Sequence, residues 1–344
     1  MLKGKAAYVF PGANTAMGYR SFFREGLAGM ERVFILKGGP GCGKSTLIRS
    51  LGRELQDKGY DVEFWQCSAD VDSLDGVLAP ALKAAVVDGT PPHVVEPLYP
   101  GAVEELVDLG ACWDGAELRR QKAQIVDLSR RISGKYEKCT EHLAEAAAVL
   151  KQSRSAVEAA TGGSDGLLEQ VFGRQKKDCR HLFASSVTPR GWESYLEPLS
   201  RRAKRRFILT GPFGGGKEDW LSAVAEEAAQ RGLYAELYHH PLAVEELQMV
   251  WLPSLETAVV GVEEAPSLRE GDIVIPCGRI TDKGQYSECR RRVKELTEAG
   301  GRQVAEAKAL HDKLEDCYRR AMDYGRVEEI RAGLLDRLLS LAEE

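Results

Sequence analysis

Residues 34–46 have the sequence FILKGGPGCGKST, which determines how the rest of the first half of the chain is interpreted. The apolar run before Gly38 predicts a buried strand, and the segment after Thr46 has the apolar spacing of a helix. Gly38, four further residues and then Gly43-Lys44-Ser45 match the pattern G-x-x-x-x-G-K-[ST]. A strand before this pattern and a helix after it are the context in which it binds phosphate.

Each residue type in this loop suits a bound triphosphate. The glycines let the chain curl so that successive backbone N–H groups converge on the β-phosphate, and the helix N-terminus adds its positive end. Lys44 is expected to contact the β- and γ-phosphates, Ser45 to bind Mg²⁺ and Thr46 to contact the α-phosphate. With ATP as the default nucleotide, we expect ATP and Mg²⁺ to be held by Gly38, Gly39, Pro40, Gly41, Cys42, Gly43, Lys44, Ser45 and Thr46.

A carboxylate is expected at the end of a neighbouring strand. Residues 84–88 are AAVVD, which predicts a short apolar strand ending in Asp88. Asp88 would hold Mg²⁺ through water together with Ser45; the alternative is that it only begins the turn before Gly89. The candidates for orienting water or contacting the γ-phosphate are His93, Thr90, Asp70 and Asp75, each with surface capping or turn chemistry as its alternative. We take Lys44, Asp88 and His93 as the candidate catalytic residues.

The chain contains an internal repeat. Residues 10–87 align with residues 183–260 without a gap, and 23 of these 78 positions are identical, against roughly one in seventeen by chance. The second copy keeps the glycines and Lys217 of the loop but has Glu218-Asp219 in place of Ser45-Thr46, and Gly261 in place of Asp88. Carboxylates near phosphates add like-charge repulsion, so weak or no nucleotide binding is expected in this copy.

The repeat sets the expected fold class: α/β, two tandem P-loop NTPase-like repeats with parallel sheets, each followed by a long helical arm. Short apolar runs between helices favour parallel sheets buried on both faces. The first repeat is expected over residues 1–163 with an arm at about 116–160, and the second over 173–344 with an arm at about 286–342. Apolar residues spaced three and four apart predict that the arms form antiparallel helices or a short coiled coil. The boundary between the repeats is expected at residues 162–173.

Composition excludes several classes of protein. The 344 residues are 43% hydrophobic and 29% charged with a net charge of -5, which is unlike a disordered or collagen-like chain. No apolar run approaches the length of a membrane helix, and the first residues lack the pattern of a signal peptide, so no membrane association is expected. Eight cysteines without a CxxC pair favour free thiols and a cytoplasmic protein. Nucleic acid is not an expected partner; the basic run at 201–206 is either a solvated face or a contact for a phosphate-rich partner.

The chain resembles a family of bacterial duplicated (tandem) P-loop proteins that are usually described only as ATPases or nucleotide-binding proteins. The resemblance covers essentially the whole chain and rests on GGPGCGKST at 38–46, CSAD at 67–70 with SLDG at 73–76, and VDGTPPH at 87–93. It implies the P-loop fold and ATP binding at Gly38–Thr46. The altered second loop departs from any model with two active sites.

These observations predict a slow Mg²⁺-dependent ATPase that uses the first repeat, with the second repeat as a degenerate structural or regulatory copy. Hydrolysis would move the helical arms and so change how they hold a protein partner. Two alternatives stay open: a small-molecule or nucleotide kinase, and a non-catalytic nucleotide-sensing scaffold that acts through its arms.

Overall fold

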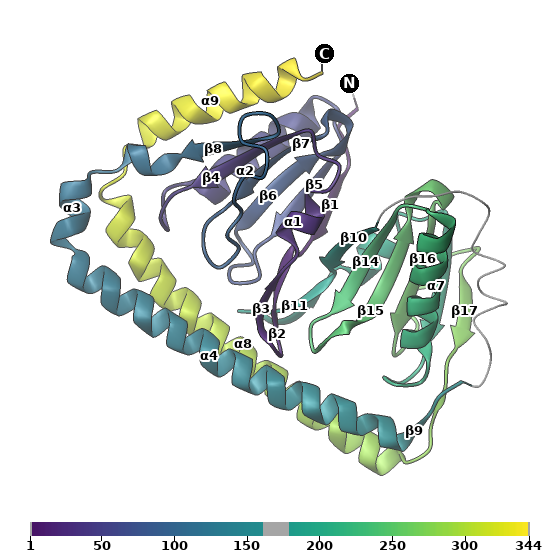
Figure 1. Ribbon diagram of the computed structural model, residues 1–344. Coiled ribbons are helices and arrows are strands. Elements are labelled where there is room, and N and C mark those ends of the chain that lie inside the picture. The colour runs from purple at the N-terminus through teal and green to yellow at the C-terminus, as the bar shows by residue number, and fades with distance from the viewer. Residues whose placement is uncertain (1, 161–178, 343–344) are drawn as a thin grey trace. The chain divides into compact units, whose positions relative to one another are not determined.

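The computed structural model describes residues 2–160 and 179–342. Their regular elements are shown in Figure 1. In the first half of the chain these are β1 (Ala6–Val9), β2 (Gly12–Thr15), β3 (Gly18–Ser21), α1 (Phe23–Gly26), β4 (Arg32–Lys37), α2 (Lys44–Asp57), β5 (Val62–Gln66), β6 (Leu74–Ala79), β7 (Ala84–Asp88), β8 (Glu104–Asp108), α3 (Gly115–Arg120), α4 (Lys122–Ser153) and β9 (Val157–Glu158). In the second half they are β10 (Cys179–Phe183), β11 (Ser185–Thr188), β12 (Gly191–Ser194), α6 (Leu196–Ser200), β13 (Arg205–Thr210), α7 (Lys217–Arg231), β14 (Ala235–His240), β15 (Ala243–Leu252), β16 (Thr257–Val262), β17 (Ile273–Pro276), β18 (Arg279–Ile280), α8 (Lys283–Arg319) and α9 (Tyr324–Ser340).

The chain is mixed α/β and builds two six-stranded sheets with the same topology. The first has the strand order β1-β5-β6-β7-β4-β8 and the second the order β10-β14-β15-β16-β13-β17. Each strand of the first sheet therefore has its counterpart at the same place in the second. The internal repeat seen in the sequence is thus a repeat of structure.

The expectation of parallel sheets is wrong for one strand in each copy. β6 pairs antiparallel with both β5 and β7, and β15 pairs antiparallel with both β14 and β16. The reason is the length of the connections, because a parallel neighbour needs a crossover of a dozen or more residues. β6 follows β5 after a short turn and is joined to β7 by a single 3₁₀ turn, Pro80–Leu82. The remaining pairs, including β4 with β7 and β4 with β8, are parallel.

The described chain divides into two compact units that do not follow the order of the repeats. Unit 1 contains Met1–Gly12, Leu27–Lys138 and Arg302–Glu344, and unit 2 contains Ala13–Gly26 and Cys139–Gly301. The end of the chain thus belongs to the unit built on the first sheet. The boundary expected at residues 162–173 lies outside the described residues.

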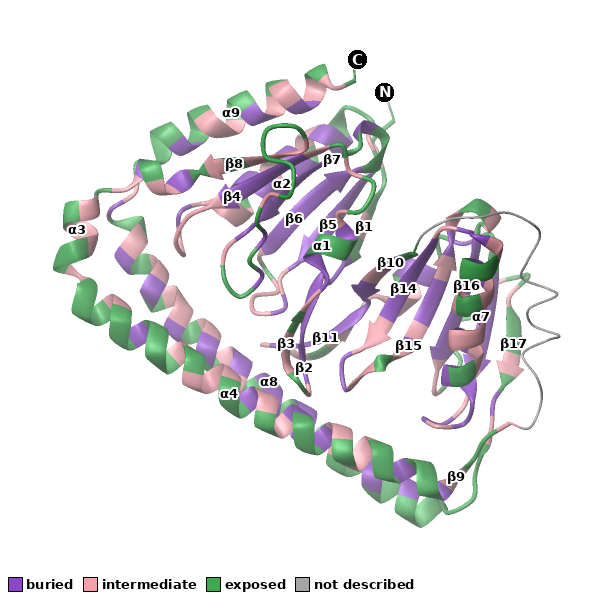
Figure 2. Ribbon diagram, viewed as in Figure 1, coloured by how far each residue is buried: buried purple, intermediate pink, exposed green. Residues whose placement is uncertain are grey.

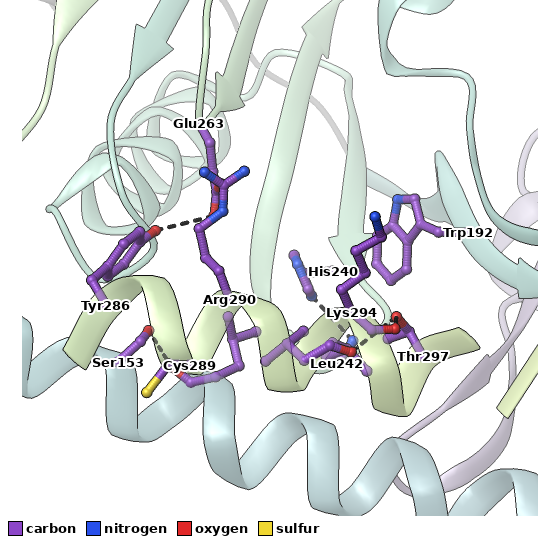
Figure 3. A pocket seen from close by; sticks show the side chains of 12 residues that line it. Ser153, Trp192, His240, Leu242, Glu263, Tyr286, Cys289, Arg290, Lys294 and Thr297 are labelled. Atoms are coloured by element: carbon purple, nitrogen blue, oxygen red, sulfur yellow. Dashed lines mark hydrogen bonds and ion pairs between the residues drawn. The ribbon is translucent and has the colours of Figure 1, made fainter. Parts of the chain in front are cut away.

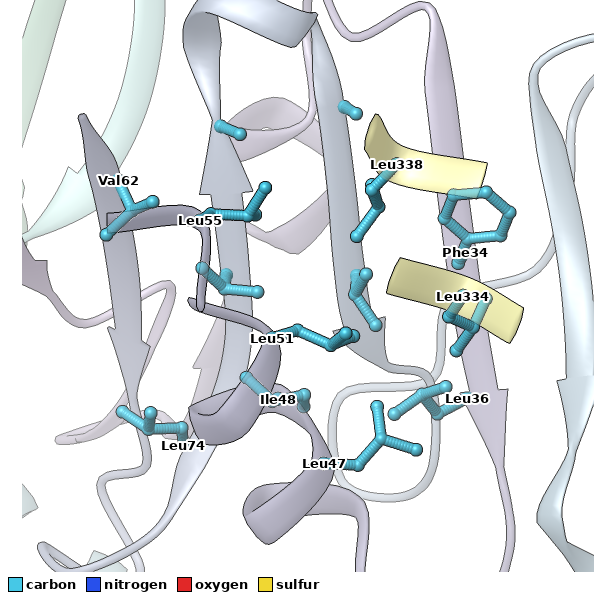
Figure 4. Close-up of a cluster of buried hydrophobic side chains, with 14 of the residues drawn as sticks. Phe34, Leu36, Leu47, Ile48, Leu51, Leu55, Val62, Leu74, Leu334 and Leu338 are labelled. Carbon is cyan, nitrogen blue, oxygen red and sulfur yellow. The ribbon is translucent and has the colours of Figure 1, made fainter. Parts of the chain in front are cut away.

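Unit 1 has its main core between the first sheet and helices α2 and α9. Leu47, Ile48, Leu51 and Leu55 of α2 face the sheet, and Leu334 and Leu338 of α9 join the same cluster (Figure 4). Burying a leucine of this kind stabilises the fold by about 1.5–3 kcal/mol. The core therefore fixes α2, and with it the loop that precedes α2, against the sheet.

Unit 2 combines the second sheet with a hairpin from the first repeat. α7 packs on the sheet through Leu221, Val224 and Ala228. The β2–β3 hairpin belongs to this unit, where the Asn14 side-chain amide donates to the carbonyl oxygen of Val187 in β11 at 2.9 Å. Buried residues are concentrated in the strands of each sheet (Figure 2).

The long helices α4 and α8 pair in antiparallel fashion within each unit. In unit 1, Leu128 of α4 packs with Leu310 and Leu314 of α8. In unit 2, Arg292 of α8 forms an ion pair with Glu145 of α4 at 2.5 Å. The helical segments of the two repeats therefore pair with one another, as the apolar spacing of three and four predicts.

Candidate functional site

The glycine-rich loop of the first repeat connects the end of β4 to the start of α2. Gly41 has φ +67° and Gly43 has φ +91°, a conformation that residues with a side chain rarely adopt. Gly43 is the N-cap of α2, and no side chain of the described residues caps it. No acidic residue lies in the first turn of α2, so its N–H groups and the positive end of the helix dipole are suited to an anion.

Lys44 lies folded back over this loop. Its ammonium donates to the carbonyl oxygens of Gly38 at 3.0 Å and Gly39 at 2.9 Å, and lies 3.5 Å from Oδ2 of Asp88. Both charged side chains are largely buried. A lysine that is held by two carbonyls and one carboxylate can exchange these contacts for those of a more highly charged anion.

Asp88 ends β7 beside β4, where Leu36 is its partner in the parallel register. Its Oδ1 accepts from the backbone N–H of Thr90 at 2.9 Å and from the Thr90 hydroxyl at 2.6 Å. Oδ2 faces Lys44. The two roles weighed from the sequence are therefore combined: Asp88 orders the turn that follows it and presents one oxygen to the lysine of the loop.

His93 lies buried behind Asp88. Its Nδ1 is 3.0 Å from the backbone oxygen of Asp88, and its Nε2 is 3.6 Å from Oδ1 of Asp75. Burial lowers the pKa of His93, but the carboxylates of Asp75 and Asp88 outweigh it and raise the pKa to about 9. Both ring nitrogens face acceptors, which also fits the doubly protonated form. The raised pKa favours the charged imidazolium form of His93, which has no lone pair with which to act as a general base.

Lys37, the last residue of β4, fixes the loop that bears His93. Its ammonium donates to the backbone oxygens of Gly89 and Val95, both at 2.9 Å, and pairs with Glu96 at 2.6 Å. This lysine holds the segment after β7 against the sheet edge. Its role is to position that segment, and it does not lie in the loop that begins at Gly38.

The remaining loop residues differ in how they face the site. The Ser45 hydroxyl accepts from the backbone N–H of Leu74 at 2.9 Å, which leaves its hydrogen and a second lone pair for a ligand. Thr46 is exposed. The Cys42 side chain is buried in the core cluster, its Sγ accepts from the Lys44 ammonium at 3.8 Å, and its pKa is raised, chiefly by burial. Gly38, Gly39 and Pro40 complete the curl.

Of the four candidates for orienting water, Asp75, Thr90 and His93 are brought together with Asp88. Asp70 is not: its Oδ2 accepts from the Ser73 hydroxyl at 2.9 Å and lies 3.3 Å from the ammonium of Lys308. Asp70 orders its own turn and pairs with α8.

Ser45 and Asp88, the two residues suggested for a metal ion, suit a magnesium ion that is bound mainly by phosphate oxygens and water. Within residues 2–160 and 179–342, no three histidine, cysteine or carboxylate side chains are grouped to hold a metal. Mg²⁺ does not need such a cage, because it usually keeps several waters and is bound by one or two protein groups plus phosphate oxygens. Ser45 and Asp88 offer one hydroxyl and one carboxylate at the same sheet edge, and that donor set suits it.

The end of the chain covers the first loop, which the sequence did not reveal. The Tyr324 hydroxyl donates to the carbonyl oxygen of Gly41 at 2.7 Å. The ring of Tyr318 lies so close to Gly39 that a Cβ there would be 2.5 Å from it. Val327 packs into the core next to Gly43. No local pattern could indicate these contacts, since they join residues almost 300 positions apart.

In the second loop, the ammonium of Lys217 is held by groups of the loop itself. Lys217 donates to the carbonyl oxygen of Pro212 at 2.8 Å and to Oε1 of Glu218 at 2.7 Å, and both charged groups are buried. Oε2 of Glu218 is buried with no hydrogen-bond partner among the described residues. The carboxylate of Glu218 thus binds Lys217. The corresponding lysine of the first loop, Lys44, is instead paired with Asp88.

The basic run at 201–206 is paired with carboxylates. Arg206 is fully buried and pairs with Asp272 and Glu197. Its neighbours form similar pairs: Arg201 with Glu197, Arg202 with Glu236 and Lys204 with Glu256. These pairs stabilise unit 2, and the alternative of a solvated face is wrong for Arg206, which is fully buried.

Comparison with models of protein families, with curated proteins and with solved structures gives no match to this chain. None of the helices in the described part of the chain is long and apolar enough to cross a membrane. All eight cysteines are free thiols.

Proposed function

We propose that unit 1 binds Mg²⁺-ATP at Gly38–Thr46 as a P-loop nucleotide-binding protein and hydrolyses it slowly. The observation that carries the proposal is the convergence of Lys44, the uncapped N-terminus of α2 and Asp88 at one edge of the sheet. An anion with several charges can accept from Lys44 and from the N–H groups of α2 at once. Asp88 pairs with Lys44, and Mg²⁺ would neutralise the repulsion of this carboxylate toward phosphate.

In this proposal each residue has a separate task. Lys44 leaves the carbonyls of Gly38 and Gly39 and neutralises charge on the β- and γ-phosphates, while the N–H groups of the loop bind the β-phosphate. Ser45 and Asp88 hold Mg²⁺, which when bound shields phosphate charge during transfer to water. His93 adds a fixed positive charge behind Asp88.

The rate is expected to be low because His93, the candidate catalytic histidine, is held in its charged form and is not poised to take a proton near neutral pH. His93 has a pKa of about 9, and its two ring nitrogens already face acceptors. Catalysis would then depend on positioning and charge neutralisation alone.

A second candidate function, a nucleotide-sensing scaffold without turnover, is favoured by the contacts of α8 and α9 on the loop. Tyr318 and Tyr324 touch the loop at Gly39 and Gly41. A nucleotide that changes the loop would change these contacts, and so the packing of the last two helices. The contacts described for this loop do not favour the kinase alternative over these two functions.

The test is binding and turnover of ATP by the full chain with Mg²⁺, beside Lys44→Ala and the matched variant Lys217→Ala. We expect Lys44→Ala to abolish binding and Lys217→Ala to leave it unchanged, since Lys217 is neutralised by Glu218. Binding with turnover above the Lys44→Ala background supports the ATPase, and binding without it supports the sensor. If the wild type binds neither ATP nor GTP, both forms of the proposal fail.

A further inference from the structure

Unit 2 contains a cavity that the nucleotide proposal does not use. Its volume is about 360 Å³, within the range of small-molecule sites. It lies at the carboxyl ends of β14, whose last residue is His240, and of β16, which is followed by Glu263, and it is also lined by α8 and the end of α4. Ligands of α/β sheets bind at this edge.

One wall of the cavity is aromatic and its floor is apolar. The ring of Trp192 lies 5.6 Å from that of His240, tilted by 43°, and 39% of Trp192 is exposed. Leu150, Leu242 and Val293 supply apolar surface. A tryptophan that is exposed beside such a floor offers a flat face for a planar ring.

Most polar groups of the cavity are already used within the protein. The hydroxyl of Ser153 donates to the carbonyl oxygen of Leu150 at 2.7 Å, and that of Thr297 to the carbonyl of Val293 at 3.0 Å. Tyr286 accepts from the backbone N–H of Phe213 and donates to Glu263 at 3.1 Å. These hydrogen bonds fix the shape of the cavity, so recognition of a ligand depends on the remaining polar side chains of the lining.

Three donors remain, and two of them are cations. Arg290 and Lys294 project from α8 toward the strand ends (Figure 3). Arg290 pairs with Glu263 at 2.8 Å, and the exposed ammonium of Lys294 forms a longer ion pair with Glu298 at 3.9 Å. Glu298 does not line the cavity, so the lining residues themselves carry two cations and one carboxylate, a net charge of about +1.

His240 provides the third donor without adding charge. Its Nδ1 accepts from the backbone N–H of Leu242 at 3.1 Å, which assigns the ring hydrogen to Nε2. Burial, followed by the nearby Lys217, lowers the pKa of His240 to about 3. The ring is therefore neutral and offers an N–H beside Trp192.

We propose that this cavity is a binding site for a planar aromatic monoanion, an arylcarboxylate in chemical class, with its ring against Trp192 and its carboxylate at Lys294 and His240. The aromatic wall and apolar floor suit the ring, and the net positive charge of the lining suits one negative charge. A triphosphate does not suit it, because Glu263 would repel additional charge and Glu218 already binds the lysine of the adjacent loop. The site is thus separate from the one proposed in unit 1.

The test is calorimetric titration of the full chain with 2-naphthoate, beside the neutral analogue 2-naphthalenemethanol. We expect the acid to bind and the alcohol to bind more weakly. Lys294→Gln should weaken binding of the acid about fivefold and leave the alcohol unaffected, while Trp192→Ala should weaken both by at least about tenfold. Lys283→Gln is the matched control, since Lys283 is exposed on the same helix and does not line the cavity.

The proposal is overturned if the wild type does not bind 2-naphthoate, if the alcohol binds as tightly as the acid, or if Trp192→Ala and Lys294→Gln bind the acid like the wild type. Lys44→Ala separates the two sites: it should leave naphthoate binding unchanged even if ATP binding is lost. Conversely, a failure of ATP to bind would not affect this result.

Discussion

The sharpest physical prediction concerns the buried pair of His93 and Asp75. Nε2 of His93 lies 3.6 Å from Asp75 Oδ1, and the pKa of His93 rises from an ordinary value of 6.5 to about 9 even though burial opposes its charge. The difference, 9 − 6.5, is about 2.5 units, which corresponds to about 3 kcal/mol between the two protonation states. Replacing Asp75 by Asn removes the largest of the effects that raise this pKa.

The sign of the pH dependence follows from the direction of the shift. A group whose pKa is higher in the folded state contributes stability that is fully present below its unfolded pKa, here 6.5, and is lost as the pH rises through about 9. In Asp75→Asn, burial is no longer outweighed by Asp75, so the pKa of His93 should fall to near or below 6.5. The loss of stability between pH 6.5 and 9 should then disappear.

The assay is a histidine-labelled NMR titration of the full chain from pH 5 to 10. The chain has six histidines, and His93→Gln identifies the resonance of His93. Asp72→Asn is the control, because Asp72 is an exposed aspartate near the same strand. If His93 of the wild type titrates near 6.5, or if Asp75→Asn leaves its titration near 9, the electrostatic account of the site is refuted.

Three further predictions follow from single contacts. Arg206→Met leaves the buried carboxylate of Asp272 without its main partner and should destabilise unit 2 by about 3–5 kcal/mol in urea unfolding; a loss under 1 kcal/mol would contradict the pairing. Arg206 lowers the pKa of Asp272 to about 2, because its hydrogen bond outweighs the opposing effect of burial. The stability from this pair should therefore be present above pH 3.8 and be lost as the pH falls toward 2. Acid unfolding should show this pH dependence in the wild type and not in Arg206→Met. Gly43→Ala places a side chain at φ +91° and should cost unit 1 about 1–2 kcal/mol, so an unchanged urea midpoint would argue against this loop conformation. Tyr324→Phe removes a hydrogen bond to the loop and should speed amide exchange in the first turn of α9 about 2- to 12-fold, whereas the exposed Tyr99→Phe should have no effect there; equal rates in both variants would exclude the contact.

Local features of the sequence were sufficient for β4, the loop after it and β7. The apolar run before Gly38 forms β4, the loop curls at Gly41 and Gly43, and residues 84–88 form a strand that ends in Asp88. These features depend on neighbouring residues: apolar periodicity, glycine conformation and helix capping all act over a few positions. The duplication is equally a property of the sequence, and it accounts for the matching order of strands in the two sheets.

Other features were decided only by tertiary structure. β6 runs antiparallel because its short connections to β5 and β7 leave no room for a crossover. His93 meets Asp75 because β6 and the segment after β7 lie at the same edge of the sheet. Tyr324 reaches Gly41 because the apolar face of α9 is buried in the core of unit 1, which holds α9 beside the loop. No local sequence pattern indicates this packing. Contacts between residues far apart in the chain depend on the free energy gained by burying many side chains together. The spacing of apolar residues within one segment does not show which distant segment it will pack against. The sequence alone therefore determined the parts of the candidate site that are contiguous, and the fold determined which distant residues complete it.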